Sequence, residues 1–91
     1  MRGKVWRIEF APRAVKEWKK LDSSVQSRFR QFLKDLKGVE DPYWRGKVLT
    51  GNWAGYWSYR VGDYRLIAGI DVGEMVIVMI AMGHRSQVYA D

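Results

Sequence analysis

Two β-forming segments of the chain, Tyr56–Val61 and Tyr64–Ile70, are separated by only two residues, a glycine and an aspartate. A two-residue loop that contains glycine is typical of a tight β-hairpin. If these two residues form the loop, Arg60 lies directly opposite Arg65 on the neighbouring strand. Cross-strand neighbours project to the same face of a sheet, so the spacing predicts an antiparallel pair with two adjacent arginines on one face.

The same register assigns the other side chains of the hairpin to two faces, because successive residues of a strand alternate. The face expected to meet the core carries Tyr59, Val61, Tyr64 and Leu66. The opposite face carries Arg60, Arg65 and Ser58, with Tyr56 beside them. Two like charges opposite each other repel, which a sequence can tolerate where a phosphate binds both guanidinium groups. The alternative is that both arginines are solvated, or paired with Asp63 or Glu74.

Hydrophobic periodicity predicts the remaining elements. A strand is expected at Val5–Phe10, and the apolar run Met75–Met82 predicts the most buried strand. Apolar residues at helical spacing predict two helices between them, from Pro12 to about Leu21 and over Val25–Leu36. The sequence Asp22-Ser23-Ser24 separates the helices and can cap the second one. Residues 39–55 are loop-like, with room for a short strand at Lys47–Leu49.

The order β-α-α-β-β-β predicts an α+β fold. An N-terminal two-helix hairpin is expected to pack on one face of a mainly antiparallel sheet of about four strands. The 91 residues suffice for one domain, so residues 1–91 are expected to form a single domain. Apolar residues make up 47% of the chain, enough for a packed core, which argues against a disordered protein.

The formal net charge of +6 favours a polyanionic partner such as nucleic acid or an acidic protein. Residues 1–37 hold eleven Lys and Arg against four Asp and Glu, whereas residues 38–91 hold five against six. The excess charge of the first part suits steering and docking. The arginines of the second part, where the charges nearly balance, can act only if the fold holds each of them at a specific position.

The composition also excludes several classes of site. The chain has no cysteine, which excludes disulfides and thiolate metal sites, and its single histidine argues against a histidine metal site. No cofactor is therefore expected. The longest apolar run is too short to span a membrane and the N-terminus does not resemble a secretory signal, so a cytoplasmic protein is expected.

The segment after the last predicted strand carries the chain's only histidine, in Gly83-His84-Arg85, followed by Tyr89. His84 has the one side chain with an ordinary pKa near neutrality, which makes it the best candidate for proton transfer. Tyr89 can stack on an unpaired base. The alternatives are an exposed or capping histidine and a tyrosine that only packs. Arginines, a lysine and a histidine together suit cleavage of RNA by its own 2′-hydroxyl, which needs no metal.

Three segments resemble the RelE toxins of bacterial and archaeal toxin–antitoxin systems, within the RelE/ParE superfamily. They are Phe10–Ala14 with Trp18–Leu21, the hairpin Tyr59–Ile67, and Gly83–Arg85 with Val88-Tyr89. The resemblance covers nearly the whole chain, and the order and spacing of the segments make it specific. It implies a microbial-RNase-like fold and a ribosome-dependent mRNA endonuclease that inhibits translation.

The resemblance also implies partners and roles for particular residues. The expected partners are a RelB-like antitoxin and the 70S ribosome with mRNA in its A site. Arg65 matches the family's phosphate-stabilising arginine, Arg85 its second catalytic arginine, and Tyr89 its base-stacking tyrosine; Arg60, Ser58 and Tyr56 are expected beside the substrate. The basic helices resemble the surface that docks on ribosomal RNA, through Arg13, Lys16, Lys19, Lys20, Arg28, Arg30 and Lys34.

The chain departs from the family pattern at the general base. Some RelE toxins carry two lysines where this sequence has Tyr56 and Ser58. The segment Leu49–Ser58 is more similar to the YoeB branch, which uses a carboxylate at the position of Lys47 together with a C-terminal histidine. We therefore expect His84 to be the main proton-transfer group, with Lys47 supporting the phosphate or the 2′-oxygen.

Two alternatives stay open. ParE-like toxins share the fold but act on DNA gyrase, and they lack the catalytic cluster, whereas this chain has Arg65, His84, Arg85 and Tyr89 together. A weakly active member would act mainly by binding its antitoxin and repressing its operon. A general RNA-binding module is disfavoured because the aromatic and glycine signatures of such modules are absent from the sequence.

Overall fold

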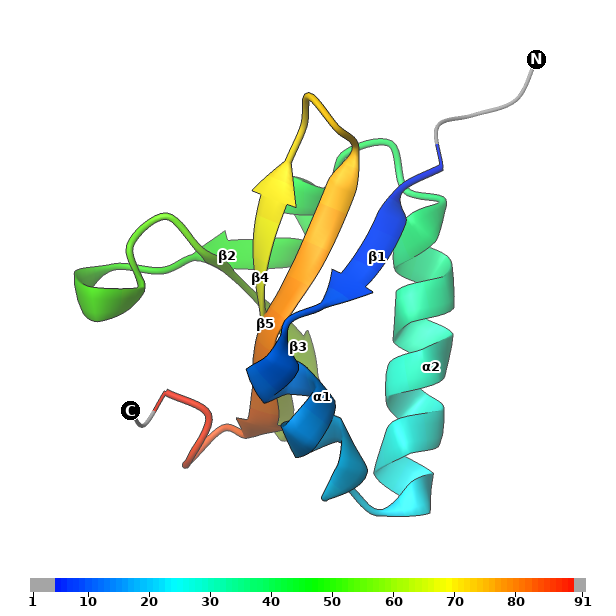
Figure 1. Ribbon diagram of the computed structural model, residues 1–91, viewed down its shortest axis with the longest axis vertical. Coiled ribbons are helices and arrows are strands. Elements are labelled where there is room, and N and C mark those ends of the chain that lie inside the picture. Colours follow the sequence, from blue (N-terminus) through cyan, green and yellow to red (C-terminus); the bar gives the residue numbers. More distant parts are fainter. Residues whose placement is uncertain (1–4, 90–91) are drawn as a thin grey trace.

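The structure, a computed structural model, describes residues 5–89 apart from the side chain of residue 44. The chain forms a five-stranded sheet of order β1-β5-β4-β3-β2, with β1 parallel to β5 and the other neighbours antiparallel (Figure 1). The elements are β1 (Arg7–Phe10), α1 (Pro12–Lys19), α2 (Ser23–Lys37), β2 (Gly46–Val48), β3 (Trp57–Val61), β4 (Tyr64–Asp71) and β5 (Val76–His84), with short 3₁₀ helices η1 (Pro42–Arg45) and η2 (Gly51–Trp53). In residues 5–89 no helix is long and apolar enough to cross a membrane.

This architecture confirms the predicted α+β class with a helical hairpin and a mainly antiparallel sheet. The strand count is five rather than about four, because Gly46–Val48, close to the short strand that the sequence allowed at Lys47–Leu49, pairs with β3 and forms the edge of the sheet. These three residues show no apolar alternation, and two of them are exposed. Backbone pairing with β3, rather than burial of its own side chains, therefore makes this segment a strand.

The hairpin register agrees with the prediction residue by residue. Gly62 and Asp63 form the turn, and Arg60 pairs with Arg65. Gly62 has a φ of 61°, a left-handed conformation that glycine adopts without a steric penalty. Tyr59 and Leu66 are buried on the helix-facing side, as expected. The turn thus sets which face every residue of β3 and β4 presents.

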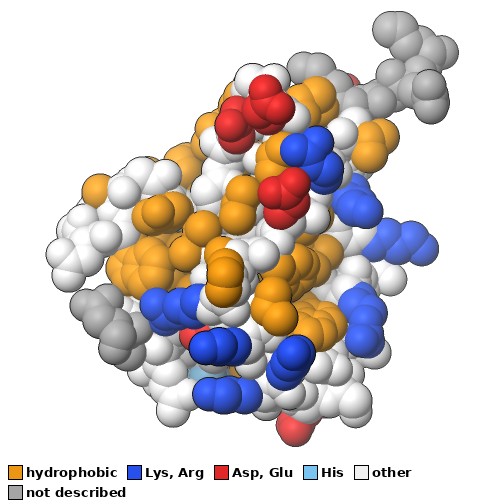
Figure 2. Space-filling model, in the orientation of Figure 1, with side chains coloured by type: hydrophobic (Ala, Val, Ile, Leu, Met, Phe, Trp, Pro, Cys, Tyr) orange, Lys and Arg blue, Asp and Glu red, His pale blue; other side chains and the backbone are white. Residues whose placement is uncertain are grey.

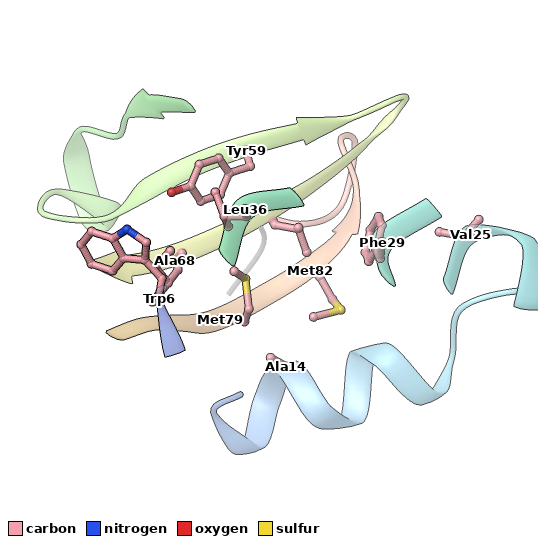
Figure 3. Packing of buried hydrophobic residues seen from close by; sticks show 11 residues of the cluster. Trp6, Ala14, Val25, Phe29, Leu36, Tyr59, Ala68, Met79 and Met82 are labelled. Atoms are coloured by element: carbon pink, nitrogen blue, oxygen red, sulfur yellow. The ribbon is translucent and has the colours of Figure 1, made fainter. Parts of the chain in front are cut away.

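The main core lies between the sheet and the two helices (Figure 3). The helices contribute Ala14 from α1 and Phe29 and Leu36 from α2, which pack against Tyr59 and Met79 of the sheet. Pro12 opens α1, where a missing backbone N–H carries no penalty. Asp22 occupies the N-cap position of α2, but its side chain makes no capping hydrogen bond, so the predicted cap holds by position only.

A second, smaller cluster lies on the other face of the sheet. Its buried members are Ile67, Ala81 and Val88, and partly buried apolar side chains cover them: Leu49, Trp53, Tyr56 and Ile80. Val88 belongs to the turn that follows β5, and Trp53 belongs to the long connection before β3. This cluster therefore attaches the C-terminal turn and the residue 49–56 loop to the sheet.

Strand β5 contains an irregularity that shifts its alternation. Ile67 pairs with Ala81 but the next residue, Ala68, pairs with Met79, so Ile80 is an extra residue in β5. Such a bulge inverts the faces of the residues beyond it. Tyr64 then pairs with His84, the last residue of β5, and residues 85–89 form turns. The chain thus leaves the sheet directly after its only histidine.

Candidate functional site

A groove of about 920 Å³ opens where β2, the hairpin end of β3 and β4, and the C-terminal turn meet. It is lined by Arg45, Gly46, Lys47, Val48, Leu49, Ser58, Arg60, Arg65, His84, Arg85, Ser86 and Tyr89. These residues come from three parts of the sequence that are far apart. The pairing of β2 with β3 and of β4 with β5 brings them together.

The groove gathers the residues that the sequence analysis singled out for chemistry, with one exception. The predicted catalytic residues Lys47, Arg65, His84 and Arg85 all line it, as do Arg60, Ser58 and Tyr89. Tyr56 does not: it packs in the second cluster, with its ring 5.9 Å from that of Trp53 and against the backbone of Gly69. Its position just outside β3 places it over the apolar part of the sheet.

The groove is strongly cationic. Five of its lining residues are basic, and among the described residues that line it none is acidic. The fifth cation, Arg45, was not foreseen; it ends η1, and its guanidinium carbon lies 6.0 Å from the ring centre of Phe32. A basic residue two positions before Lys47 was the only signal in the sequence. Such a concentration of positive charge suits a phosphodiester.

Arg65 is held by the backbone of its own hairpin. Its Nη1 donates to the carbonyl oxygens of Gly62 at 3.2 Å and Tyr64 at 3.0 Å. Carbonyls orient a guanidinium group without neutralising its charge. Arg65 thus keeps its positive charge for an anion in the groove, beside its cross-strand neighbour Arg60.

His84 has a defined orientation at the end of β5. Its ring stands edge-on to Tyr64, with centroids 5.5 Å apart, and its Nδ1 lies 2.8 Å from the Ser86 hydroxyl. The backbone N–H of Ser86 donates to the same Nδ1 at 3.2 Å. An atom that accepts a hydrogen bond carries no proton, so the neutral ring carries its proton on Nε2. Nε2–H is then the group of His84 available to donate.

Tyr89 and Ser58 form a pair across the groove. The Tyr89 hydroxyl lies 3.0 Å from the Ser58 hydroxyl, and Tyr89 remains 40% exposed. Ser58 itself is buried on the sheet. Ser58 therefore anchors the hydroxyl end of the tyrosine, and the side chain stays partly exposed in the groove.

The basic residues predicted to dock on ribosomal RNA fall into two groups. All but one of them lie on α1 or α2 or directly after α1, with their side chains exposed: Lys16, Lys19, Lys20, Arg28, Arg30 and Lys34. Figure 2 shows Lys and Arg side chains gathered over the part of the surface where α1 and α2 run. Arg30 stacks on the ring of Trp18, 5.2 Å from its centroid. Arg13 is only half-exposed and lies against the C-terminal turn, away from that group.

The chemistry open to the groove follows from these groups. Guanidinium groups and a lysine can bind a phosphate and stabilise added charge on it. The Nε2–H of His84 can donate a proton. In residues 5–89 no cluster of three or more His, Cys, Asp or Glu side chains is arranged to hold a metal ion.

Comparisons with known proteins give a consistent relationship. Residues 8–89 match the family model described as the ParE toxin of the type II toxin–antitoxin system parDE. The chain is similar to the mRNA interferase toxin RelE of Escherichia coli K12 and to the mRNA interferase RelE of Shigella flexneri, at 31% identity over 87 residues, covering 92% of this chain and 90% of each relative. It is also similar to a chain of the toxin–antitoxin complex RelBE2 from Mycobacterium tuberculosis, with a TM-score of 0.81 and 28% identity over 92% of this chain and 95% of that one.

Proposed function

Because this chain belongs to the ParE toxin family, within the RelE/ParE superfamily of type II toxin–antitoxin toxins, we propose that it is a toxin that cleaves mRNA on the ribosome. The single observation that carries the proposal is the cationic groove. It combines Arg65, Arg85 and Lys47 with a histidine that presents Nε2–H and a partly exposed tyrosine. Two relatives at 31% identity carry the name mRNA interferase.

The groups of the groove suit cleavage by the RNA's own 2′-oxygen. The 2′-hydroxyl loses its proton to water as its oxygen attacks the adjacent phosphorus, the bond from phosphorus to the 5′-oxygen breaks, and a 2′,3′-cyclic phosphate forms. Arg65 and Arg85 stabilise the charge on the phosphorane, and Lys47 supports the phosphate or the 2′-oxygen. His84 donates the Nε2 proton to the leaving 5′-oxygen and regains a proton from solvent. Tyr89 stacks on a base next to the cut, and Arg60 binds a neighbouring phosphate.

This mechanism runs without a metal ion, because the five cations of the groove supply the positive charge at the phosphate. Cleavage is therefore expected to persist at chelator concentrations that leave the ribosome–mRNA complex intact. The ribosome itself needs Mg²⁺, so the measurement uses a stalled, isolated ribosome–mRNA complex and compares chelator with added Mg²⁺ at matched ionic strength. A large loss of cleavage in chelator, with the complex still intact by sedimentation, would contradict this part of the proposal.

Cleavage mapping on a translated message tests the proposal. Wild-type toxin is added to a reconstituted translation reaction, and cuts are mapped by primer extension. His84→Gln and Arg65→Ala are each expected to lower the cleavage rate by about 10²-fold or more, with ribosome binding intact. Lys37→Ala, which removes a charge on α2 outside the groove, serves as the control. An uncut message with the wild-type protein, or full activity in His84→Gln, would overturn the assignment.

A second candidate function has one specific observation in its favour. The family model that matches the chain is described as a ParE toxin, and ParE-like toxins act on DNA gyrase. A gyrase supercoiling assay, run beside the cleavage assay, separates the two functions. Both of these toxins are expected to arrest growth when expression is induced. A family member that only binds its antitoxin and represses its operon is not.

We also propose a RelB-like antitoxin as the partner, with both proteins and the ribosome in the cytoplasm and residues 1–91 acting as one domain. The structure of a similar chain at 28% identity is a RelBE2 complex. The positive charge of this chain favours an acidic antitoxin. Co-expression of an adjacent small acidic open reading frame is expected to relieve growth arrest and to yield a stable complex on size-exclusion chromatography.

A further inference from the structure

Arg13 of α1 reaches the C-terminal turn rather than the exposed face of its helix. Its Nη2 donates to the carbonyl oxygen of Val88 at 3.2 Å. Its guanidinium carbon lies 5.5 Å from the ring centre of Trp53, which is also part of the cluster that covers Val88. One side chain therefore joins α1, the loop before β3 and the turn after β5.

Glu17, one helical turn after Arg13, holds the arginine in this position. Its Oε2 accepts a hydrogen bond from Arg13 Nε at 3.1 Å, and its Oε1 accepts one from the backbone N–H of Met82 at 2.8 Å. The pairing of β1 with β5 ends at Met79, so Met82 lies on a stretch of β5 beyond that strand. Glu17 takes the place of the missing strand there and fixes α1 to the end of β5.

The turn that Arg13 contacts carries two groups of the groove. Arg85 begins the turn, and Tyr89 follows the buried Val88 within it. Within the turn, the N–H groups of Gln87 and Val88 donate to the carbonyl of His84. The N–H of Arg85 donates to the carbonyl of Asp63 in the β3–β4 hairpin. The position of the turn therefore sets where both side chains stand relative to Arg65.

We propose that Arg13 is a positioning residue for the cleavage site: held by Glu17, it fixes the C-terminal turn and so places Arg85 and Tyr89 in the groove. This assigns Arg13 to the chemical step and separates it from the exposed basic residues of the same helix, such as Lys16. The expected effect of Arg13 on the cleavage rate rests on the proposed ribonuclease function. The structural effect of Arg13 can be measured on the free protein.

Amide hydrogen exchange by NMR tests the structural part without any substrate. Arg13→Ala is expected to speed exchange of the Val88 and Gln87 amides by about tenfold or more, while amides at the centre of β4 keep wild-type rates. Lys37→Ala is the control and is expected to leave both sets unchanged. Unchanged exchange at Val88 in Arg13→Ala, or an equal rise throughout the sheet, overturns the proposal.

Single-turnover cleavage tests the kinetic part. Arg13→Ala is expected to lower the rate at saturating ribosome by about tenfold, with the half-saturating ribosome concentration within about twofold of wild type. Lys16→Ala is expected to show the opposite pattern. The effects of Arg13→Ala and Tyr89→Ala are expected to be less than multiplicative in the double variant, because both act through the same turn. A purely raised half-saturating concentration in Arg13→Ala would show a docking role and overturn the proposal.

Glu17→Gln separates positioning from a general loss of stability. Its amide oxygen can still accept from Met82 N–H, but the negative charge that holds Arg13 is gone. For Glu17→Gln, the cleavage rate and the Val88 amide exchange rate are expected to lie between those of wild type and Arg13→Ala. Arg13→Lys is expected to recover part of the cleavage rate and of the Val88 protection that Arg13→Ala loses. Wild-type values in Glu17→Gln overturn the role of this carboxylate. If the wild-type protein cuts no message, the proposed function fails, whereas the exchange result still decides the positioning of the turn.

Discussion

At the scale of single residues, the groove orients its cations without neutralising them. Backbone carbonyls of Gly62 and Tyr64 hold Arg65, and the Tyr89 hydroxyl is held by Ser58, which is uncharged. The two ion pairs found in residues 5–89 that join Arg to Glu, Arg7–Glu9 and Arg13–Glu17, lie outside the groove lining. The positive charge of Arg65 is therefore retained for a substrate.

Replacing Arg65 by lysine tests whether charge alone is sufficient. Lysine keeps the charge but lacks the planar fork that can bind two phosphate oxygens while Nη1 donates to the backbone carbonyls. The Arg65→Lys variant is expected to lose cleavage by about 10²-fold, close to the loss in Arg65→Ala. The measurement is the single-turnover rate on a ribosome–mRNA complex. Activity within a few-fold of wild type in Arg65→Lys would show that Arg65 contributes only a point charge.

Tyr59 gives a stability prediction that depends on pH. Its hydroxyl donates to the carbonyl oxygen of Pro42 at 2.9 Å inside the core. Burial, with smaller contributions from Tyr43 and Asp41, raises the pKa of the Tyr59 phenol well above its ordinary value. A raised folded-state pKa means that its stabilising contribution is complete below the unfolded-state pKa of about 10 and is lost as pH rises beyond it.

The matched variant is Tyr59→Phe, which cannot ionise. At pH 8 it is expected to be less stable than wild type by about 1–2 kcal/mol, because the Pro42 carbonyl loses its donor. Above pH 10 this difference is expected to shrink by up to about 1.4 kcal/mol per pH unit. Urea unfolding of both proteins between pH 8 and pH 11 measures it. A difference that stays constant over this range would contradict the assignment.

At the scale of elements, local patterns in the sequence predicted the hairpin, its register and the strands beside it, but not the side-chain contacts between distant segments. The Gly62-Asp63 turn fixes its own register, so the spacing of the sequence alone was sufficient to pair Arg60 with Arg65. The sequence allowed a short strand at Lys47–Leu49, and β2 forms one residue earlier, at Gly46–Val48, where it pairs with β3. The contacts of Arg13 with Val88 and of Arg45 with Phe32 join distant segments, which periodicity and turn chemistry do not encode.

The edge strand β2 begins with Gly46, whose Cα lies close to the neighbouring strand β3. A Cβ on Gly46 would lie 2.4 Å from Trp57 Cδ1 and 2.7 Å from the carbonyl oxygen of Ser58. Gly46 pairs with Tyr59 and directly precedes Lys47, which lines the groove. The absence of a side chain at Gly46 therefore lets β2 approach β3 and places Lys47 beside Ser58.

Gly46→Ala is accordingly expected to destabilise the fold by about 1–3 kcal/mol and to displace Lys47, lowering cleavage further than Lys47→Ala does. Gly38→Ala is the control, because a Cβ there meets nothing closer than 3.9 Å and the residue has a φ of −99°. The control is expected to raise the unfolding free energy by up to about 1 kcal/mol. Thermal and urea unfolding measure both variants. Equal stabilities for the two alanine variants would remove the steric argument.

At the scale of the whole molecule, positive charge is divided between two surfaces with different tasks. The helices carry exposed cations such as Lys16, Arg28 and Lys34. The groove carries its own cations on β2, on the β3–β4 hairpin and on the C-terminal turn. The exposed charges on the helices attract and bind a polyanion, and this binding depends strongly on salt. The charges in the groove act on the reacting phosphate.

This division predicts that binding and chemistry respond separately to salt and to charge removal. The triple variant Lys16→Gln, Arg28→Gln and Lys34→Gln is expected to weaken ribosome binding and to flatten its dependence on salt, by about one unit of log–log slope for each phosphate that the variant no longer neutralises. Its cleavage rate at saturating ribosome is expected to stay near wild type. Lys47→Gln is expected to show the reverse, with a normal salt slope and slow cleavage, because the lysine acts only once the message lies in the groove. Binding and single-turnover cleavage measured across a salt series check both; the same salt slope in the triple variant as in wild type would mean that the helices are not the docking surface.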